Sequence, residues 1–407
     1  MKNKKTILLI ILLITIFLSQ QINAQSYKQI HEKAIVVDTH NDFLMQVTDD
    51  AVVKYRNNKI AFDKDLKGKT HIDLARQKEG GLDVQVFSIF CTGDMKTPFS
   101  FANRQIDSLD AMIARNPDKI IKAVNSNDIL KAVKQHKLVA MIGVEGGHMI
   151  EDDLNKLDIL YKRGARYMTL TWNNSTSWAT SAYDETFKKD LTHKGLTDFG
   201  KQVVNRMNKL GMIVDISHVG EQTFWDVINT STKPVIASHS SVYNLCNHQR
   251  NLKDDQIKAI AKNGGVIQVN FNPPFIDSSF AKKETIFFQK HKTEMDSLNK
   301  NVLDGWLMEN YLYSKYAAEA NAMRPPLAIL IQQIEYIINL VGVDYVGLGS
   351  DFDGINITPQ QLDDVTNYPL ITKVLVEKGY SKKDITKIIG GNFLRVLKAN
   401  EVTAKGN

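Results

Sequence analysis

The sequence has few cysteines for its length. Cys91 and Cys246 are the only two among its 407 residues. Two cysteines allow at most one disulfide, which excludes the disulfide-dense scaffolds of small secreted proteins. Two buried thiols are an equally good interpretation, and neither cysteine has neighbours that indicate a cysteine-ligated metal.

The sequence also lacks a strong charge of either sign. Its formal net charge is +6, and Lys2, Lys4 and Lys5 account for half of that excess. No run of five or more basic residues occurs, so nucleic acid is not an expected partner. Internal repeats and low-complexity linkers are absent as well. With 43% hydrophobic and 24% charged residues, the chain has the composition of a globular protein with a large core.

The N-terminus has an apolar run that is too short for a membrane span. The run Ile7–Leu18 follows the three lysines and precedes Gln20 and Ala24, whereas a transmembrane helix needs about 20 apolar residues. This pattern predicts a signal peptide over residues 1–24. We expect an exported protein, periplasmic or secreted, with no membrane anchor after cleavage; an uncleaved anchor is the alternative. Residues 25–407 are predicted to form a single domain.

Short apolar runs alternate with amphipathic stretches along the rest of the chain. The predicted strands are Ile35–Asp38, Val84–Phe90, Val139–Gly143, Tyr167–Thr171, Ile213–Asp215, Val235–Ala237, Val266–Val269 and Tyr345–Gly349. The predicted helices are Asp73–Gln77, Ala102–Arg115, Leu154–Arg163, Thr197–Leu210, Glu221–Asn229, Asp254–Lys262 and Leu327–Val341. Alternating strands and helices indicate parallel pairing through crossover helices.

Eight such units favour an α/β fold of the (β/α)8 TIM-barrel type. A doubly wound open sheet is the competing fold, but no Gly-x-Gly-x-x-Gly follows the first strand. The charged stretch at about 278–324 has aromatic residues at helical spacing and predicts a helical insertion after strand seven. It either packs over the barrel, contacts a partner subunit or is a solvated helical face.

Polar side chains follow several of the predicted strands. Enzymes with this fold carry their chemistry at the carboxyl ends of the strands. Three histidines and three carboxylates lie at these positions: His40, Asp42, Glu145, His218, His239 and Asp351. Clustered carboxylates are costly unless cations neutralise them, so the pattern predicts a metal site.

Imidazole and carboxylate ligands without thiolate suit Zn²⁺, and Mn²⁺ or Co²⁺ could also be held. Five ligands exceed the need of one tetrahedral ion. Two ions per chain would use all five, with His40 and Asp42 on one, His218 and His239 on the other, and Glu145 bridging. Such a pair can hold a hydroxide between the ions and polarise a carbonyl. Asp351 is then the candidate proton shuttle, and the chemistry indicated is metal-assisted hydrolysis.

Several ordered motifs resemble the membrane (renal-type) dipeptidase family of zinc peptidases. The match runs from about Ile30 to Val396. It rests on Asp38-Thr39-His40-Asn41-Asp42, Gly143-Val144-Glu145-Gly146-Gly147-His148, Gly195-Leu196-Thr197-Asp198-Phe199-Gly200, Asp215-Ile216-Ser217-His218-Val219, Ser238-His239-Ser240-Ser241, Arg250-Asn251-Leu252, Gly347-Leu348-Gly349-Ser350-Asp351-Phe352-Asp353-Gly354 and Gly390-Gly391-Asn392-Phe393-Leu394-Arg395-Val396.

The resemblance implies roles for individual residues. It implies that the five ligands hold two zinc ions with Glu145 as the bridge, and that Asp351 is the acid–base residue. Arg250 matches the family arginine that pairs with the terminal carboxylate of the substrate, as a guanidinium fork can. The family cleaves dipeptides, often with a D-residue at the C-terminal position, and is often dimeric, so a homodimer is an expectation from resemblance alone.

One position departs from the family pattern. The family usually has a histidine in a Leu-Thr-His motif near the substrate carbonyl, whereas this chain reads Leu170-Thr171-Trp172. An indole donates one hydrogen bond and cannot take a proton, and loss of an oxyanion donor can cost about 10²–10³ in turnover. One alternative follows: the same metal core acting on another small amide, lactam or ester. A more remote alternative is a non-catalytic binding protein on an inherited barrel, with the insertion as its contact surface.

Overall fold

The computed structural model describes residues 27–56, 60–300 and 305–402. The predicted signal peptide, residues 1–24, lies outside them. Within the described part, no helix is both long and apolar enough to cross a membrane. The two cysteine thiols are buried and free, so Cys91 and Cys246 form no disulfide.

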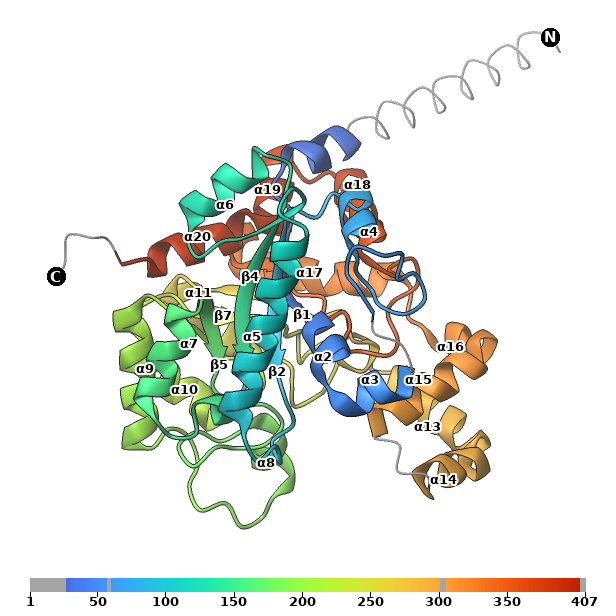
Figure 1. Cartoon of the computed structure of the whole chain (residues 1–407), viewed down its shortest axis with the longest axis horizontal. Coiled ribbons are helices and arrows are strands. Elements are labelled where there is room, and N and C mark those ends of the chain that lie inside the picture. The colour runs from blue at the N-terminus through green and yellow to red at the C-terminus, as the bar shows by residue number, and fades with distance from the viewer. Residues whose placement is uncertain (1–26, 57–59, 301–304, 403–407) are drawn as a thin grey trace, which may run out of the picture.

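A parallel sheet curls into a barrel at the centre of the molecule (Figure 1). Its strands are β1 Val37–Asn41, β2 Val84–Phe90, β4 Leu138–Glu145, β5 Ala165–Thr169, β6 Ile213–Asp215, β7 Ile236–Ala237, β8 Val266–Val269 and β9 Val346–Leu348, paired in that order. The two ends of this path meet, because Asn41 bridges Phe352 and the Asp42 N–H donates to the Phe352 carbonyl at 2.9 Å. The predicted TIM-type barrel is confirmed.

Helices cover the outside of the barrel (Figure 1). After a first helix over residues 27–33, they are α2 Phe43–Thr48, α3 Asp50–Arg56, α4 Leu74–Glu79, α5 Pro98–Arg115, α6 Ser126–Val133, α7 Leu154–Lys162, α8 Ala182–Phe187, α9 Asp198–Leu210, α10 Glu221–Thr230, α11 Asp254–Asn263, α12 Pro273–Ile276, α13 Phe280–Lys290, α14 Lys292–Lys300, α15 Gly305–Lys315, α16 Ala317–Met323, α17 Leu327–Val341, α18 Tyr368–Glu377, α19 Lys382–Thr386 and α20 Asn392–Asn400.

All eight predicted strands and seven predicted helices are present, with ends shifted by a few residues. Among the strands, the largest shift concerns β1, which extends to Asn41, so that His40 lies inside the strand rather than beyond it. A ninth strand, β3 Ile120–Lys122, was not predicted. It pairs with β4 outside the barrel path. Its three residues are too few to show an alternation of apolar and polar side chains in the sequence.

The predicted insertion is helical and follows β8, the seventh barrel strand. Helices α13–α16 stand together at the lower right of Figure 1 and share a small apolar cluster that includes Phe287 and Leu312. They are attached to the chain that follows β9: the Trp306 indole donates to the Gly354 carbonyl at 3.1 Å, and the Asn356 amide donates to the Trp306 carbonyl at 3.0 Å. The insertion therefore packs over the barrel, which is one of the three alternatives that the sequence left open.

Candidate metal centre and active site

His40 and Asp42 project from the end of β1 toward the same point. His40 is fully buried, and its Nε2 lies 3.5 Å from Asp42 Oδ2. Side chains two positions apart share a face of an extended strand, and this spacing brings the imidazole and the carboxylate together. Asp42 Oδ1 is buried and has no hydrogen-bond partner among the described residues.

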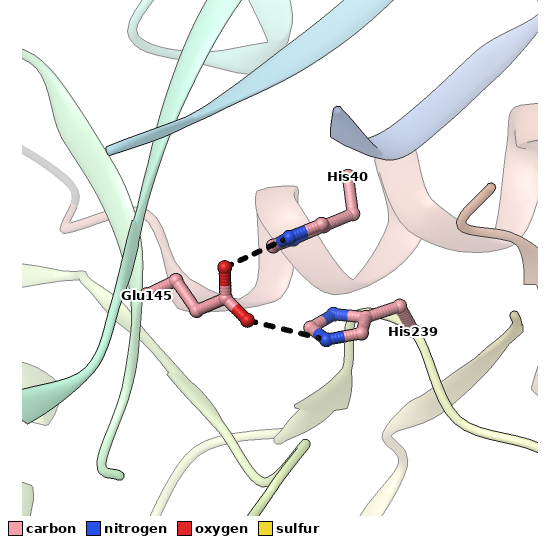
Figure 2. Close-up of side chains that lie close together, drawn as sticks. All are labelled: His40, Glu145 and His239. Carbon is pink, nitrogen blue, oxygen red and sulfur yellow. Dashed lines mark hydrogen bonds and ion pairs between the residues drawn. The ribbon is translucent and has the colours of Figure 1, made fainter. Parts of the chain in front are cut away.

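Glu145, the last residue of β4, lies at the middle of the cluster. Its Oε2 is 3.2 Å from His40 Nε2, and its Oε1 is 2.9 Å from His218 Nε2 and 3.5 Å from His239 Nε2. Figure 2 shows the two carboxylate oxygens pointing toward different imidazoles. A carboxylate that bridges two cations needs one oxygen facing each of them.

His218 and His239 follow β6 and β7. Their Nε2 atoms are 3.0 Å apart. The Nδ1 of His218 contacts the Asn173 amide oxygen at 3.1 Å, and the Nδ1 of His239 contacts Ser238 Oγ at 2.8 Å. All three histidines therefore turn Nε2 toward Glu145 and Nδ1 toward the surrounding protein.

Asp351 reaches the same point from the end of β9. The Asn270 amide donates to its Oδ2 at 3.0 Å. Burial raises the pKa of Asp351 to about 7; the charges of Asp42 and Glu145 act in the same direction, and His40 opposes them. A carboxyl group that titrates near neutral pH is suited to exchange protons during a reaction.

The electrostatics of the cluster favour cation binding. Burial opposes the ionisation of Glu145, but the contacts with the three histidines outweigh it and lower its pKa well below the usual range. Burial lowers the pKa of His218 to about 3 and that of His239 well below its ordinary value. Neutral imidazoles such as these two, beside an ionised carboxylate, are the forms that bind metal ions. Burial opposes the protonation of His40, but the contacts with Tyr167, Glu145 and Asp42 outweigh it and raise its pKa well above the ordinary value, so a cation there would displace a proton.

The donor atoms also lie close enough to share ions. Those of His40, Glu145 and His239 are within 4.8 Å of one another, and so are those of His40, Asp42 and Asp351. The unpaired Asp42 Oδ1 provides a further acceptor. Nitrogen and oxygen donors without sulfur fit Zn²⁺, Mn²⁺ or Co²⁺, so the residues present fit the metal that the sequence predicts.

A cavity of about 370 Å³ opens onto the cluster. Its lining includes Asp42, Glu145, His218 and Asp351, together with Arg250, Trp172, Phe90, Phe275 and Trp306. Charged and aromatic side chains therefore share its lining. Such a cavity matches a small ligand with one anionic group and apolar side chains.

Arg250 is buried at the edge of this cavity. Its Nη2 donates to the His239 carbonyl at 3.3 Å, and its guanidinium lies 5.5 Å from the centre of the Phe275 ring. Its Nε and Nη1 have no hydrogen-bond partner among the described residues. Burial lowers the pKa of Arg250 to about 10, so it stays cationic at neutral pH and can receive an anion.

Trp172 is one of the aromatic residues that line the cavity. Its ring centre is 5.0 Å from that of Phe90 in an edge-to-face arrangement and 6.5 Å from that of His218. The adjacent Asn173 contacts His218. The structure thus brings all eight predicted site residues to one cavity and the cluster of histidines and carboxylates beside it.

The sequence reasoning missed three residues of the site. Asn270 follows β8 directly, and the strand-end rule, had it been applied to that strand, would have indicated it. Tyr167, whose hydroxyl is 2.9 Å from His40 Nδ1, lies within β5 and carries no such signal. Trp306 belongs to the insertion, and only the folded chain brings it to the cavity.

The fold and the cluster together define a metal-dependent hydrolase on a (β/α)8 barrel. The chain matches the membrane dipeptidase family (peptidase family M19) over residues 24–407. It belongs to this family and is a metal-dependent dipeptidase.

Individual relatives agree with this assignment. An uncharacterized dipeptidase of Schizosaccharomyces pombe is 32% identical over 400 residues, covering 95% of this chain and 85% of that protein. The crystal structure of the probable dipeptidase PvdM from Pseudomonas aeruginosa is 25% identical, has a TM-score of 0.73 and covers 93% of this chain and 98% of that one. A Rhodobacter sphaeroides metallo peptidase, solved with a phosphinate mimic of the dipeptide L-Ala-D-Ala, is 21% identical, has a TM-score of 0.72 and covers 91% and 100%.

Proposed function

We propose that the protein is an exported binuclear zinc dipeptidase that accepts short peptides, including those with a D-residue at the C-terminal position. The observation that carries the binuclear proposal is the position of Glu145, whose two oxygens face different histidines. In this proposal His40 and Asp42 hold one ion, His218 and His239 hold the other, and Glu145 bridges them.

Zinc ions held in this way would polarise the scissile carbonyl and lower the pKa of a water molecule, which supplies the nucleophile. The chain's own residues would orient the substrate and move protons. Arg250 would bind the terminal carboxylate through its unpaired Nε and Nη1. Asp351, held by Asn270, would take the proton from the attacking water and pass it to the leaving amine.

Two parts of the proposal have separate support. The Rhodobacter sphaeroides structure with a dipeptide mimic containing a D-residue shares the fold of this chain, and that prompts the expectation of D-residue tolerance. Export rests on the sequence pattern of residues 1–24, and a periplasmic or secreted location is part of the same proposal.

The first experiment is hydrolysis of a panel of L-L and L-D dipeptides by zinc-loaded and chelator-treated protein, with metal content determined by elemental analysis. We expect two zinc ions per chain and turnover of at least one L-D member that is lost on chelation and restored by zinc. Cleavage of L-L members alone would contradict the D-residue proposal. One metal per active chain would contradict the binuclear proposal.

Asp351→Asn tests the proton-transfer role. Asparagine has the same shape, can still accept from Asn270 and tolerates the left-handed backbone at this position, but it cannot carry the proton. We expect turnover to fall by about 10²–10⁴ with unchanged zinc content. Loss of zinc together with activity would instead identify Asp351 as a ligand.

Trp172 supports a second candidate, the same core acting on another small amide, lactam or ester. The indole lies at the cavity wall where the family pattern has a histidine. Under this candidate dipeptide turnover is weak in the natural protein, and Trp172→His raises it. A high dipeptidase rate that falls in Trp172→His would reject the candidate.

A further inference from the structure

We infer that Ser238 and Tyr167 are positioning residues that fix the tautomers of two metal-binding histidines, because the proton of each hydroxyl is already committed to another acceptor. The inference depends on the proposed ligand roles of His239 and His40. Neither hydroxyl touches the cavity, and neither contact can be recognised from the sequence.

The first relay runs from Asp215 through Ser238 to His239. Ser238 Oγ is 2.6 Å from Asp215 Oδ2 and 2.8 Å from His239 Nδ1. The Asp215 carboxylate also accepts from the Ser217 and Ser238 N–H groups, at 3.0 and 2.9 Å, and from Thr169 Oγ1 at 2.5 Å. Backbone N–H groups can only donate, so Asp215 is the acceptor of this network, and the single Ser238 proton goes to Asp215. Ser238 Oγ must then accept a proton from His239 Nδ1.

The second relay runs from the Thr39 carbonyl through Tyr167 to His40. The Tyr167 hydroxyl lies 2.9 Å from the Thr39 oxygen and 2.9 Å from His40 Nδ1. A peptide carbonyl can only accept, so the phenol proton goes to Thr39 and the hydroxyl accepts from His40 Nδ1. Gly143 makes room for this ring, since a Cβ there would lie 2.0 Å from Tyr167 Cζ.

Both relays have the same consequence. A neutral imidazole carries one proton, and a proton held on Nδ1 leaves the Nε2 lone pair facing Glu145, 3.2 Å away in His40 and 3.5 Å away in His239. In His239, whose pKa burial lowers well below its ordinary value, the correct tautomer therefore exists before a cation arrives. In His40, whose pKa the contacts with Tyr167, Glu145 and Asp42 raise well above its ordinary value, a cation takes the place of the proton on Nε2.

Asp215→Asn distinguishes this role from simple packing. An asparagine amide can donate to Ser238 Oγ, which frees the serine proton to bind His239 Nδ1 and favours the tautomer with the proton on Nε2. Ser238→Ala removes the oxygen that accepts the proton of His239 Nδ1, but it does not favour the tautomer with the proton on Nε2. Ser241→Ala is the matched control, because Ser241 is a buried serine of the same segment. Within the described part of the chain, its hydroxyl contacts only the Asn270 carbonyl, at 3.4 Å.

The readouts are the imidazole ¹⁵N chemical shifts of His239 in histidine-labelled, metal-free protein and the zinc affinity from competition with a chromophoric chelator. We expect the Nδ1–H tautomer in the natural protein and in Ser241→Ala, and a shift toward Nε2–H in Asp215→Asn. Zinc affinity should fall about 10–100-fold in Asp215→Asn and in Ser238→Ala. Thermal unfolding of the metal-free variants establishes that they are folded.

Unchanged ¹⁵N shifts and zinc affinity in Asp215→Asn would overturn the inference for His239. Tyr167→Phe, which keeps the ring and removes the hydroxyl, applies the same two readouts to His40 if the Asp215 variant does not fold. Absence of dipeptide hydrolysis in the natural protein would contradict the proposed function and leave the tautomer result standing, so the two failures can be told apart.

Discussion

Two site residues have a backbone conformation that their side chains disfavour. His218 and Asp351 have φ angles of 65° and 64°, in the left-handed region. Such a conformation costs about 1–3 kcal/mol when the residue is not glycine. Hydrogen bonds maintain it: the Asp351 N–H donates to the His40 carbonyl at 3.2 Å, and the His218 carbonyl accepts from Ala182 N–H at 2.8 Å. Strain at these two positions is consistent with a functional role, since the turns place both side chains in the cluster.

Gly354 is the residue next to the carboxylates where even one methyl group should matter. A Cβ there would lie 2.2 Å from Asp42 Oδ2 and 2.8 Å from Asp351 Oδ1. We expect Gly354→Ala to displace both carboxylates, lower zinc affinity at least tenfold and reduce turnover, with little loss of metal-free stability. Isothermal titration with zinc measures this. Gly305→Ala is the control, because its Cβ would meet no atom within 4 Å, and equal affinities in the two variants would contradict the prediction.

At the level of elements, the strand ends explain which site residues could be predicted. His40, Asp42, Glu145, His218, His239 and Asp351 lie at or just after strand termini, where the fold rule applies. Tyr167 lies inside β5, and its hydroxyl contacts His40 on β1. Its role depends on the relative position of two strands, which a pattern along one strand does not contain.

Trp306 connects the insertion to the cavity. It comes from α15 and lines the cavity. Removing a large apolar contact from a binding pocket costs about 1.5–3 kcal/mol, which corresponds to about 10–150-fold in specificity. We expect Trp306→Ala to reduce kcat/KM for dipeptides with leucine or phenylalanine side chains about tenfold or more, and to affect alanyl-alanine little. Trp306→Phe should retain most of the preference; an equal loss for all dipeptides would indicate a structural role only.

Asp83, just before β2, is expected to make the stability of the barrel depend on pH. It accepts from the Val36 N–H at 2.9 Å, and burial raises its pKa to about 6. The folded state therefore holds this proton more tightly than the unfolded state, whose pKa is near 3.9, and the free energy of unfolding falls as pH rises from about 4 to 6.

Asp83→Asn removes this effect and keeps an acceptor for Val36. We expect the variant to be about 1–3 kcal/mol more stable than the natural protein at pH 8 and equally stable at pH 4. Denaturant unfolding of the metal-free proteins at the two pH values measures the difference. A variant that is less stable at pH 8 would show that the charged form of Asp83 is favourable.

At the scale of the whole molecule, parallel closure of the barrel brings distant segments to one point. The cluster draws residues from the ends of β1, β4, β6, β7 and β9. The alternating pattern predicted the barrel, and the barrel predicted that these ends would meet. The contact between Trp306 and Gly354 could not be predicted, because the insertion has no periodic relation to the strands and its position depends on its own apolar cluster.

Cation binding should therefore stabilise the entire barrel rather than one loop. Without a cation, burial and the charge of Glu145 raise the pKa of Asp42 and of Asp351, and like charges in such a site oppose folding. A ligand that binds only the folded state adds about 2.7 kcal/mol at 100 times its Kd. We expect zinc to raise the Tm progressively with its concentration, and a chelator to reverse the increase.

Glu145→Gln supplies the control for this measurement. It removes a buried negative charge and the proposed bridge while keeping the shape of the side chain. We expect its metal-free Tm to be lower than that of the natural protein, because the contacts with the three histidines stabilise the ionised carboxylate in the folded state, and its increase with zinc to be much smaller. If the natural protein bound zinc with no change in Tm, the unfolded chain would have to bind zinc equally well. That outcome is incompatible with ligands that only the closed barrel brings together.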